Sequence, residues 1–226
     1  LTINVYFGQE NYKSKYTRLS QFEFQELLKD SASLSGNYYI IHYEKGKVRG
    51  IDVKKYHKGE KIGEWLGFLT TIGTMDLASV CNYRNNKLQG YFFITDNHTY
   101  YEEGYYKNGK KHGIWARNLH SDTDIIEIIT YKKGNKHGKY SLKENLGVEI
   151  SVIKGRYKKG KKYGKWTVKE STELGDVITN GAYKNDEKHG LWATKDETLP
   201  VIKEDNSKEE YFIIKEYYKN GVLINQ

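Results

Sequence analysis

The sequence predicts an all-β protein: an elongated, single-layer stack of antiparallel β-hairpins with a short N-terminal helix as its cap. A ten-residue pattern, Tyr-x-x-Gly-x-x-x-Gly-x-Trp, recurs with variation along the 226-residue chain. From Tyr56 to Tyr183 its lead tyrosines are 27, 23, 25, 26 and 26 residues apart. Aromatic residues reach 14% although hydrophobic residues make up only 37% of the chain, which favours shallow burial of rings over a deep core.

The copies of this pattern, called repeats below, differ in how closely they follow it. Clean copies span Tyr56–Trp65, Tyr106–Trp115 and Tyr157–Trp166. Looser copies span Tyr83–Phe92, Tyr131–Tyr140 and Tyr183–Trp192, a degenerate copy begins at Tyr43, and a truncated one begins at Tyr218. A period of about 25 residues is typical of stacked arrays, in which no repeat buries its apolar face alone.

The fourth position of the pattern predicts a tight turn. It holds only Gly, Asn or Asp, at Gly46, Gly59, Asn86, Gly109, Gly134, Gly160, Asp186 and Gly221. These residue types best tolerate a left-handed backbone, and Asn-Gly is a strong hairpin signal. The flanks are rich in strand formers, as in IIEIITY at 125–131. Each repeat is therefore expected to be an antiparallel hairpin.

The eighth position is glycine in every full copy. These structural glycines are Gly63, Gly90, Gly113, Gly138, Gly164 and Gly190, preceded by Gly50 in the degenerate copy. We interpret the position as a close approach, where a ring or neighbouring backbone leaves no room for a Cβ. Valine at Gly138 or Gly164 is then expected to clash with its neighbours.

The aromatic residues of successive repeats are expected to form one column. Its members are Tyr56, Trp65, Tyr83, Phe92, Tyr106, Trp115, Tyr131, Tyr140, Tyr157, Trp166, Tyr183 and Trp192. Burying the two rings of one repeat contributes at most about 8–12 kcal/mol. Ordering about 25 residues costs on the order of 1–2 kcal/mol each, so a hairpin must stack on its neighbours.

The chain is expected to have two parts. Residues 1–37 form a strand and helix cap, and residues 38–226 form the array of about seven full repeats and a terminal half repeat. A capping box at Ser20 and Glu23 predicts a helix over about 21–33. Covering the first hairpin is the expected role of this helix, and binding a partner is the alternative.

Lysines gather at the predicted turns. The chain carries a net charge of +8, and the candidate binding edge consists of Lys107, Lys110, Lys111, Lys132, Lys133, Lys136, Lys158, Lys159, Lys161 and Lys162. The loops between repeats are acidic, at Asp122, Asp124, Glu170, Glu173, Asp176, Asp196, Glu197, Glu204, Asp205, Glu209 and Glu210. If the hairpins stack in parallel, all turns lie on one edge and all loops on the other, which gives a basic edge and an opposite acidic edge. Solubility alone is the alternative explanation for the charged turns.

No catalytic residue, metal site or cofactor is expected. His112, His137 and His189 belong to separate repeats, and hairpins in a stack lie about 9–10 Å apart, which is too far for a shared ion. Cys81 is the single cysteine, so no intramolecular disulfide can form. Nucleic acid is not an expected partner, because the column requires the aromatic residues that would otherwise stack on bases.

Four segments carry a family resemblance. YKNGKKHGIW, YKKGNKHGKY, YKKGKKYGKW and YKNDEKHGLW resemble the bacterial variant of the MORN repeat (membrane occupation and recognition nexus), and the likeness extends over about 38–225. The resemblance implies stacked β-hairpins in a single-layer sheet that serve as an interaction module without catalysis. It further implies lipid binding for some members, and an antitoxin role for many bacterial ones.

The leading functional hypothesis is a non-catalytic repeat scaffold that binds another protein along its sheet. The alternatives are an antitoxin or immunity protein that neutralises a toxin, and peripheral binding to anionic membrane surfaces. The chain starts at Leu1, so an export signal, a longer N-terminal portion or a fragment boundary is expected before it. We expect a bacterial protein that is either exported or cytoplasmic.

Overall fold

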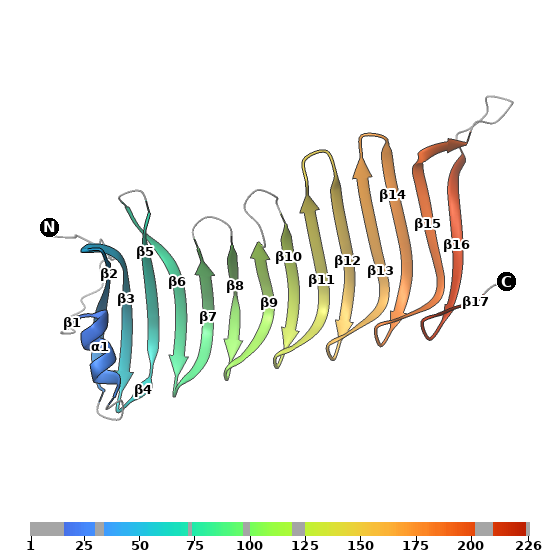
Figure 1. Cartoon of the computed structure of the whole chain (residues 1–226). Helices are drawn as coiled ribbons and strands as arrows, with labels where there is room; N and C mark the ends of the chain where they lie inside the picture. Colours follow the sequence, from blue (N-terminus) through green and yellow to red (C-terminus); the bar gives the residue numbers. More distant parts are fainter. Residues whose placement is uncertain are drawn as a thin grey trace. The chain divides into compact units, whose positions relative to one another are not determined.

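The computed structural model describes residues 16–29, 34–71, 74–96, 100–118, 125–201 and 210–224. These residues form one helix and seventeen strands (Figure 1). The chain divides into two compact units, which we describe separately: unit 1 comprises residues 1–77 and 83–86, and unit 2 comprises residues 78–82 and 87–226. The predicted all-β fold of antiparallel hairpins with one short N-terminal helix is confirmed.

Unit 1 begins with β1 (Tyr16–Ser20), α1 (Gln21–Leu28), β2 (Gly36–Glu44), β3 (Lys47–His57), β4 (Glu60–Lys61) and β5 (Gly63–Thr71). Strand β1 runs parallel to β2, whereas β2, β3 and β5 pair in antiparallel order. Strand β6 (Thr74–Arg84) contributes its two ends to unit 1 and its middle to unit 2.

Helix α1 begins where the capping box predicts. The amide of Ser20 donates to Oε2 of Glu23 at 2.6 Å, and the amide of Glu23 donates to Oγ of Ser20 at 3.3 Å. The first of these bonds is the main reason that the pKa of Glu23 lies below its ordinary value. The helix ends at Leu28, earlier than expected, and its Phe24 packs on the rings of Tyr38 and Tyr56.

Unit 2 continues with β7 (Lys87–Thr95), β8 (Tyr101–Lys107), β9 (Lys110–Asn118), β10 (Ile126–Lys132), β11 (Asn135–Asn145), β12 (Ile150–Lys158), β13 (Lys161–Thr172), β14 (Gly175–Lys184), β15 (Glu187–Val201), β16 (Glu210–Lys219) and β17 (Val222–Ile224). From β7 to β17 each strand pairs antiparallel with the next. Unit 2 is therefore an open single layer whose strand order follows the chain, and its hairpin turns share one edge (Figure 1).

The hairpin turns have the geometry that the fourth position predicts. All eight residues at that position have positive φ, for example 73° at Gly109 and 75° at Asp186. The preceding residue also has positive φ, even where it is a lysine, as at Lys133 and Lys159. Two consecutive left-handed residues define a type I′ turn, whose twist matches that of the paired strands.

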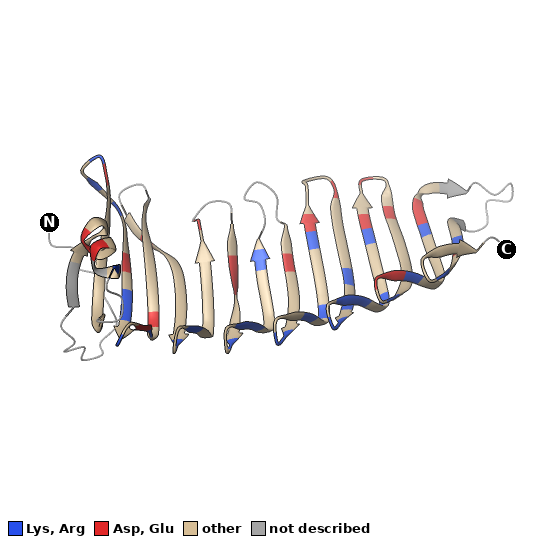
Figure 2. Ribbon diagram, turned by 60° about the horizontal axis from the view of Figure 1, so that its bottom comes forward, with Lys and Arg blue, Asp and Glu red and all other residues tan. Residues whose placement is uncertain are grey.

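A ladder of backbone hydrogen bonds joins successive turns. From Asn86 onward, the fourth-position amide donates to the sixth-position carbonyl of the preceding repeat, as Gly134 does to Lys111 at 2.9 Å and Gly160 does to Lys136 at 2.8 Å. Unit 1 contains the same bond, from Asn86 to Lys61 at 3.1 Å. In unit 2 this ladder fixes each turn against its neighbour along the edge that Figure 2 turns toward the viewer.

The aromatic residues of the pattern pack ring against ring within each unit. In unit 1, Trp65 contacts Tyr56 and Tyr83, with centroids 5.1 and 4.8 Å apart. In unit 2 the contacts run from Phe92 through Tyr106 and Trp115 to Tyr131, and from Tyr140 through Tyr157, Trp166, Tyr183 and Trp192 to Tyr218. Most neighbouring rings meet edge to face, the arrangement that their quadrupoles favour.

Candidate interaction surfaces

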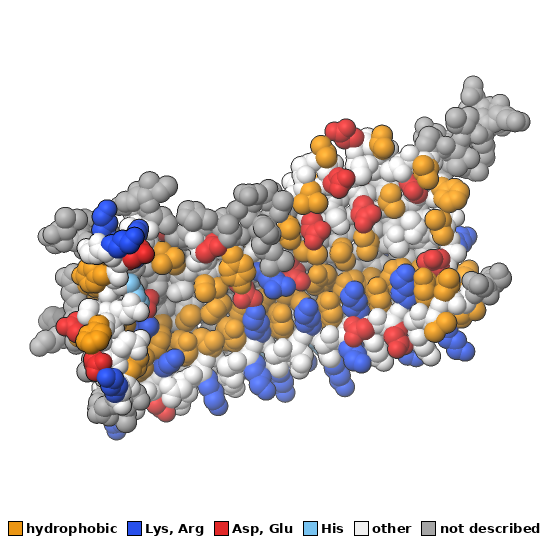
Figure 3. All heavy atoms as spheres, viewed as in Figure 1, with side chains coloured by type: hydrophobic (Ala, Val, Ile, Leu, Met, Phe, Trp, Pro, Cys, Tyr) orange, Lys and Arg blue, Asp and Glu red, His pale blue; other side chains and the backbone are white. Residues whose placement is uncertain are grey.

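The sheet of unit 2 has two faces of different character. Side chains alternate between them along each strand. The aromatic face carries the rings of the pattern, such as Tyr157 and Trp166, and Figure 3 shows it as a row of hydrophobic side chains with cations spaced along it. The reverse face carries the residues between them, such as Arg156 and Lys165.

Three tryptophans on the aromatic face are buried although the sheet is a single layer. Trp115, Trp166 and Trp192 are 1%, 2% and 5% exposed. Each ring lies against a glycine on the neighbouring strand, two residues before the lead tyrosine, and each glycine lies at a break in strand register; these are Gly104, Gly155 and Gly181. A Cβ at any of them would come within 2.3 Å of the indole. Bare backbone therefore provides the surface that buries each ring.

The eighth-position glycines from Gly63 to Gly190 do not make the expected close approach, whereas Gly50 of the degenerate copy does, because a Cβ there would lie 2.7 Å from the carbonyl oxygen of Phe68. A Cβ built at Gly113, Gly164 or Gly190 would meet no atom within 4 Å. At Gly138 it would lie 3.4 Å from Cβ of Thr130, an ordinary contact. All six have positive φ, between 64° at Gly63 and 98° at Gly138, so backbone conformation is what requires glycine there. The close approach belongs instead to glycines in the sequence Gly-x-Tyr-Lys, a signal that precedes three of the tryptophan repeats.

Three of the ten candidate edge lysines belong to the aromatic face. Lys111, Lys136 and Lys162 occupy the sixth position and are only partly exposed. The Nζ of Lys111 lies 3.9 Å from the ring centroid of Trp115, and that of Lys162 lies 4.8 Å from that of Trp166. Their aliphatic chains and ammonium groups cover the aromatic rings of the pattern, so these lysines stabilise the fold through cation–π contact.

The other seven candidate lysines form an exposed row at the turns of unit 2. We call this set the turn edge: Lys107, Lys110, Lys132, Lys133, Lys158, Lys159 and Lys161. None of them forms an ion pair with another described residue. In Figure 2 the ribbon of unit 2 is blue, for Lys and Arg, at the turns along this edge, and red, for Asp and Glu, at the later turns.

The loops opposite the turn edge do not form a uniform acidic edge in the described residues. Asp176 pairs with Lys169 at 2.6 Å, and Glu197 pairs with Lys195 at 2.6 Å. Glu170 and Glu173 are exposed, and Asp196 accepts hydrogen bonds from Thr198. Asp122, Asp124, Glu204, Asp205 and Glu209, together with the side chain of Glu210, lie outside the described part.

A charged cluster interrupts the aromatic face between Trp115 and Tyr140. Glu127 is 5% exposed and accepts a hydrogen bond from Nε of Arg117, which lies opposite it on the next strand. Burial is the main reason that the pKa of Tyr140 is raised, and the charge of Glu127 raises it further. Because Arg117 forms an ion pair with this buried carboxylate, we interpret the cluster as part of the packing of the sheet.

Two of the seventh-position side chains cap the turn of the following repeat. Nδ1 of His137 accepts a bond from the amide of Lys159 at 3.5 Å, and Oε1 of Gln89 accepts one from that of Asn108 at 2.9 Å. Among the described residues no three His, Cys, Asp or Glu side chains lie close enough to hold a metal ion together. In the same residues, no helix is both long and apolar enough to cross a membrane.

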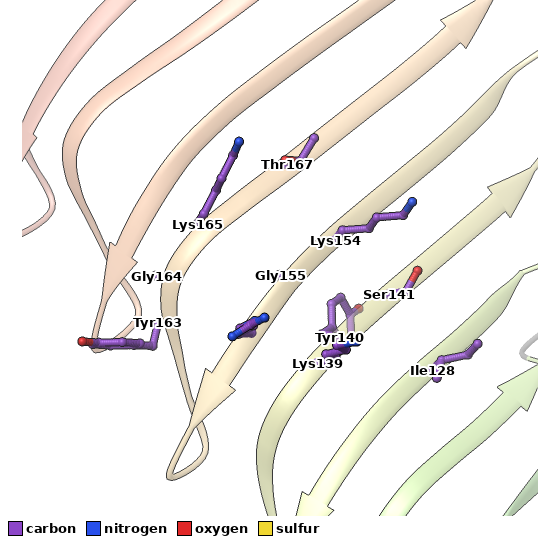
Figure 4. A pocket seen from close by; sticks show the side chains of 11 residues that line it. Ile128, Lys139, Tyr140, Ser141, Lys154, Gly155, Tyr163, Gly164, Lys165 and Thr167 are labelled. Carbon is purple, nitrogen blue, oxygen red and sulfur yellow. The ribbon is translucent and has the colours of Figure 1, made fainter.

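An open cavity of about 810 Å³ lies on the reverse face over β11, β12 and β13. Four exposed cations contribute to its lining: Lys139, Lys154, Arg156 and Lys165. Figure 4 shows the three lysines standing on adjacent strands, with Tyr163 near the turn and Ile128 on the other side. The repeat pattern does not predict this cluster, because only the strand register brings these residues together.

A scan against protein-family models gives no match for this chain. A search of curated proteins likewise gives no match.

Proposed function

We propose that the protein is a non-catalytic scaffold of MORN-like repeats that binds another protein through its turn edge. The turn edge carries the proposal, because it holds seven exposed lysines that have no ion-pair partner among the described residues. The backbone ladder holds the turns that display these lysines. The positive charge is therefore presented in a fixed arrangement.

The spacing of the charges favours a protein surface over a small anion. Successive hairpins of a sheet lie about 9–10 Å apart, whereas the Debye length at physiological ionic strength is about 8 Å. The charge of an anion bound at one turn is thus largely screened from the lysines of the next turn. Tight binding therefore requires a partner that contacts several turns at once. Lysine provides diffuse attraction and not the paired hydrogen bonds of arginine, which fits an acidic protein surface.

The test compares the full chain with a turn-edge variant carrying Lys107→Gln, Lys133→Asn and Lys159→Asn. Asparagine is chosen because it tolerates the left-handed backbone at positions 133 and 159. Each protein is immobilised, exposed to a lysate of the source organism, and washed at low and high salt. We expect defined acidic proteins to be retained by the native chain, to be lost from the variant by at least about tenfold, and to elute as salt rises.

Two outcomes would contradict this proposal. Retention that is equal for both proteins and insensitive to salt would show that the turn edge does not bind. Sedimentation of the native chain with phosphatidylserine vesicles, without any retained protein, would instead favour a membrane surface as the partner.

A further inference from the structure

We infer that the reverse face of unit 2 over β11–β13 is a second binding surface, which takes an acidic, extended polypeptide segment. This inference goes beyond the proposed function, because it concerns a different face and different residues. We call the four cations Lys139, Lys154, Arg156 and Lys165 the reverse-face cluster. They gather around the cavity of about 810 Å³.

Strand register brings the reverse-face cluster together. Lys139 on β11 lies directly opposite Arg156 on β12, and Ser141 lies opposite Lys154 in the same ladder. Lys165 lines the same cavity from β13. Because neighbouring strands are about 4.8 Å apart, these cations lie within one or two strand spacings of each other (Figure 4). Like charges placed opposite each other repel, so an anionic ligand would relieve this repulsion.

No described carboxylate neutralises the reverse-face cluster. None of its four members forms an ion pair with another described residue. On the same face, Asp176 is paired with Lys169, and Glu197 is paired with Lys195. The cluster therefore leaves its positive potential available to an outside partner.

The surroundings of the cluster favour a polypeptide over a nucleic acid. Ile128 borders the cavity with 44% of its surface exposed, and Ile114 on the neighbouring strand is 65% exposed. These aliphatic groups offer contact to apolar side chains and provide no platform for bases. Tyr163 is the exposed ring at the cavity, and Nζ of Lys158 lies over this ring, 4.8 Å from its centroid. The ammonium group therefore occupies a ring face on which a base would need to stack.

The test measures binding of a fluorescein-labelled peptide in which glutamate alternates with leucine and serine, by fluorescence anisotropy near physiological salt. Two variants of the full chain each lose three positive charges. The reverse-face variant carries Lys154→Gln, Arg156→Gln and Lys165→Gln, and the matched control is the turn-edge variant described above. We expect the reverse-face variant to bind at least about tenfold more weakly, and the control to change affinity less than about threefold.

The inference is overturned by any of three results. The peptide does not bind the native chain, both variants weaken its binding equally, or a single-stranded oligonucleotide binds the native chain more tightly and loses binding in the reverse-face variant. Melting temperatures within a few degrees of the native value verify that both variants fold, as expected for exposed positions. Lysate capture by the turn edge is measured separately, so the two proposals can fail independently.

Discussion

The indole of Trp166 lies against the backbone of Gly155, where an added Cβ would come within 2.2 Å of the ring. The two residues sit on adjacent strands, at the break in register between β12 and β13. The contact leaves Trp166 only 2% exposed in a sheet that has no second layer. Hydrophobic burial in this fold thus depends on a missing side chain as much as on the rings themselves.

Gly155→Ala is expected to destabilise the protein by about 2–3 kcal/mol, because the new methyl group and the indole ring overlap. The matched change is Gly164→Asn, expected to cost less than about 1 kcal/mol, because the site is open and asparagine tolerates its φ of 70°. Urea denaturation of both variants provides the measurement. Equal losses of stability would contradict the assignment of the close approach to Gly155.

The tryptophans at 115 and 166 allow a hydrogen bond to be separated from packing. Each has a ring tilted by 35° beside it, Phe92 for the first and Tyr140 for the second. Nε1 of Trp115 donates to the carbonyl of Tyr105 at 3.2 Å, whereas Nε1 of Trp166 is buried and has no partner in the described part of the chain. We expect Trp115→Phe to be more destabilising than Trp166→Phe by about 1 kcal/mol. Denaturant titration of both variants tests this, and the reverse order would refute it.

Lys162 and Lys161 are neighbours in sequence with different expected roles. Nζ of Lys162 lies 4.8 Å and 4.9 Å from the ring centroids of Trp166 and Tyr183, whereas Lys161 is exposed at the turn. Lys162→Ala is expected to lower stability by about 1–2 kcal/mol, through lost cation–π contact and lost cover of the rings. Lys161→Ala should change it by less than about 0.5 kcal/mol. Thermal melts of the two variants side by side are sufficient, and indistinguishable curves would exclude a structural role for Lys162.

Buried and half-buried tyrosines make the stability of the protein depend on pH in the alkaline range. Burial is the main cause that raises the pKa of Tyr56 to about 12 in unit 1, and it also raises the pKa of Tyr131, Tyr140 and Tyr157 in unit 2. Unfolded tyrosine titrates near 10, so the native state holds these protons more tightly. Their contribution is complete below pH 10 and is lost as pH rises toward 12.

We therefore expect the melting temperature to be nearly constant between pH 8 and about pH 9.5 and to fall steadily from pH 10 to 12. Absorbance at 295 nm should show a group of tyrosines in the native protein that ionise later than the same residues in urea. Superimposable titration curves for the native and unfolded protein would show that the rings are not held in their neutral form.

The sequence was sufficient for the hairpins and their turns because those follow from local chemistry. Only Gly, Asn and Asp occupy the fourth position, and a left-handed backbone explains that restriction without any tertiary contact. The eighth-position glycines from Gly63 to Gly190 also have positive φ, so the residue type alone does not distinguish a positive φ from a close approach. The glycines that do approach an indole, such as Gly155, lie at breaks in strand register, and only the register shows that the Gly-x-Tyr-Lys sequence places them against a tryptophan.

The candidate site was predicted in part for a related reason. The turn pattern predicts the ten lysines as one exposed group, although Lys111 and Trp115 are four residues apart on one strand and therefore share a face. Strand alternation alone would have separated the sixth-position lysines from the turn edge. The pairing of Lys139 with Arg156 joins residues from two repeats, and only the register of β11 and β12 brings them together.

In unit 2 the bond from a fourth-position amide reaches only the repeat immediately before it, as from Gly160 to Lys136 and from Gly134 to Lys111. Excision of residues 132–157 would leave the amide of Gly160 facing the carbonyl of Lys111, which is chemically the same acceptor. A gene encoding such a chain can gain or lose whole repeats by recombination without leaving the backbone amide of a turn unpaired. The number of repeats can therefore change by whole units, while the hydrogen bond that joins neighbouring turns stays the same.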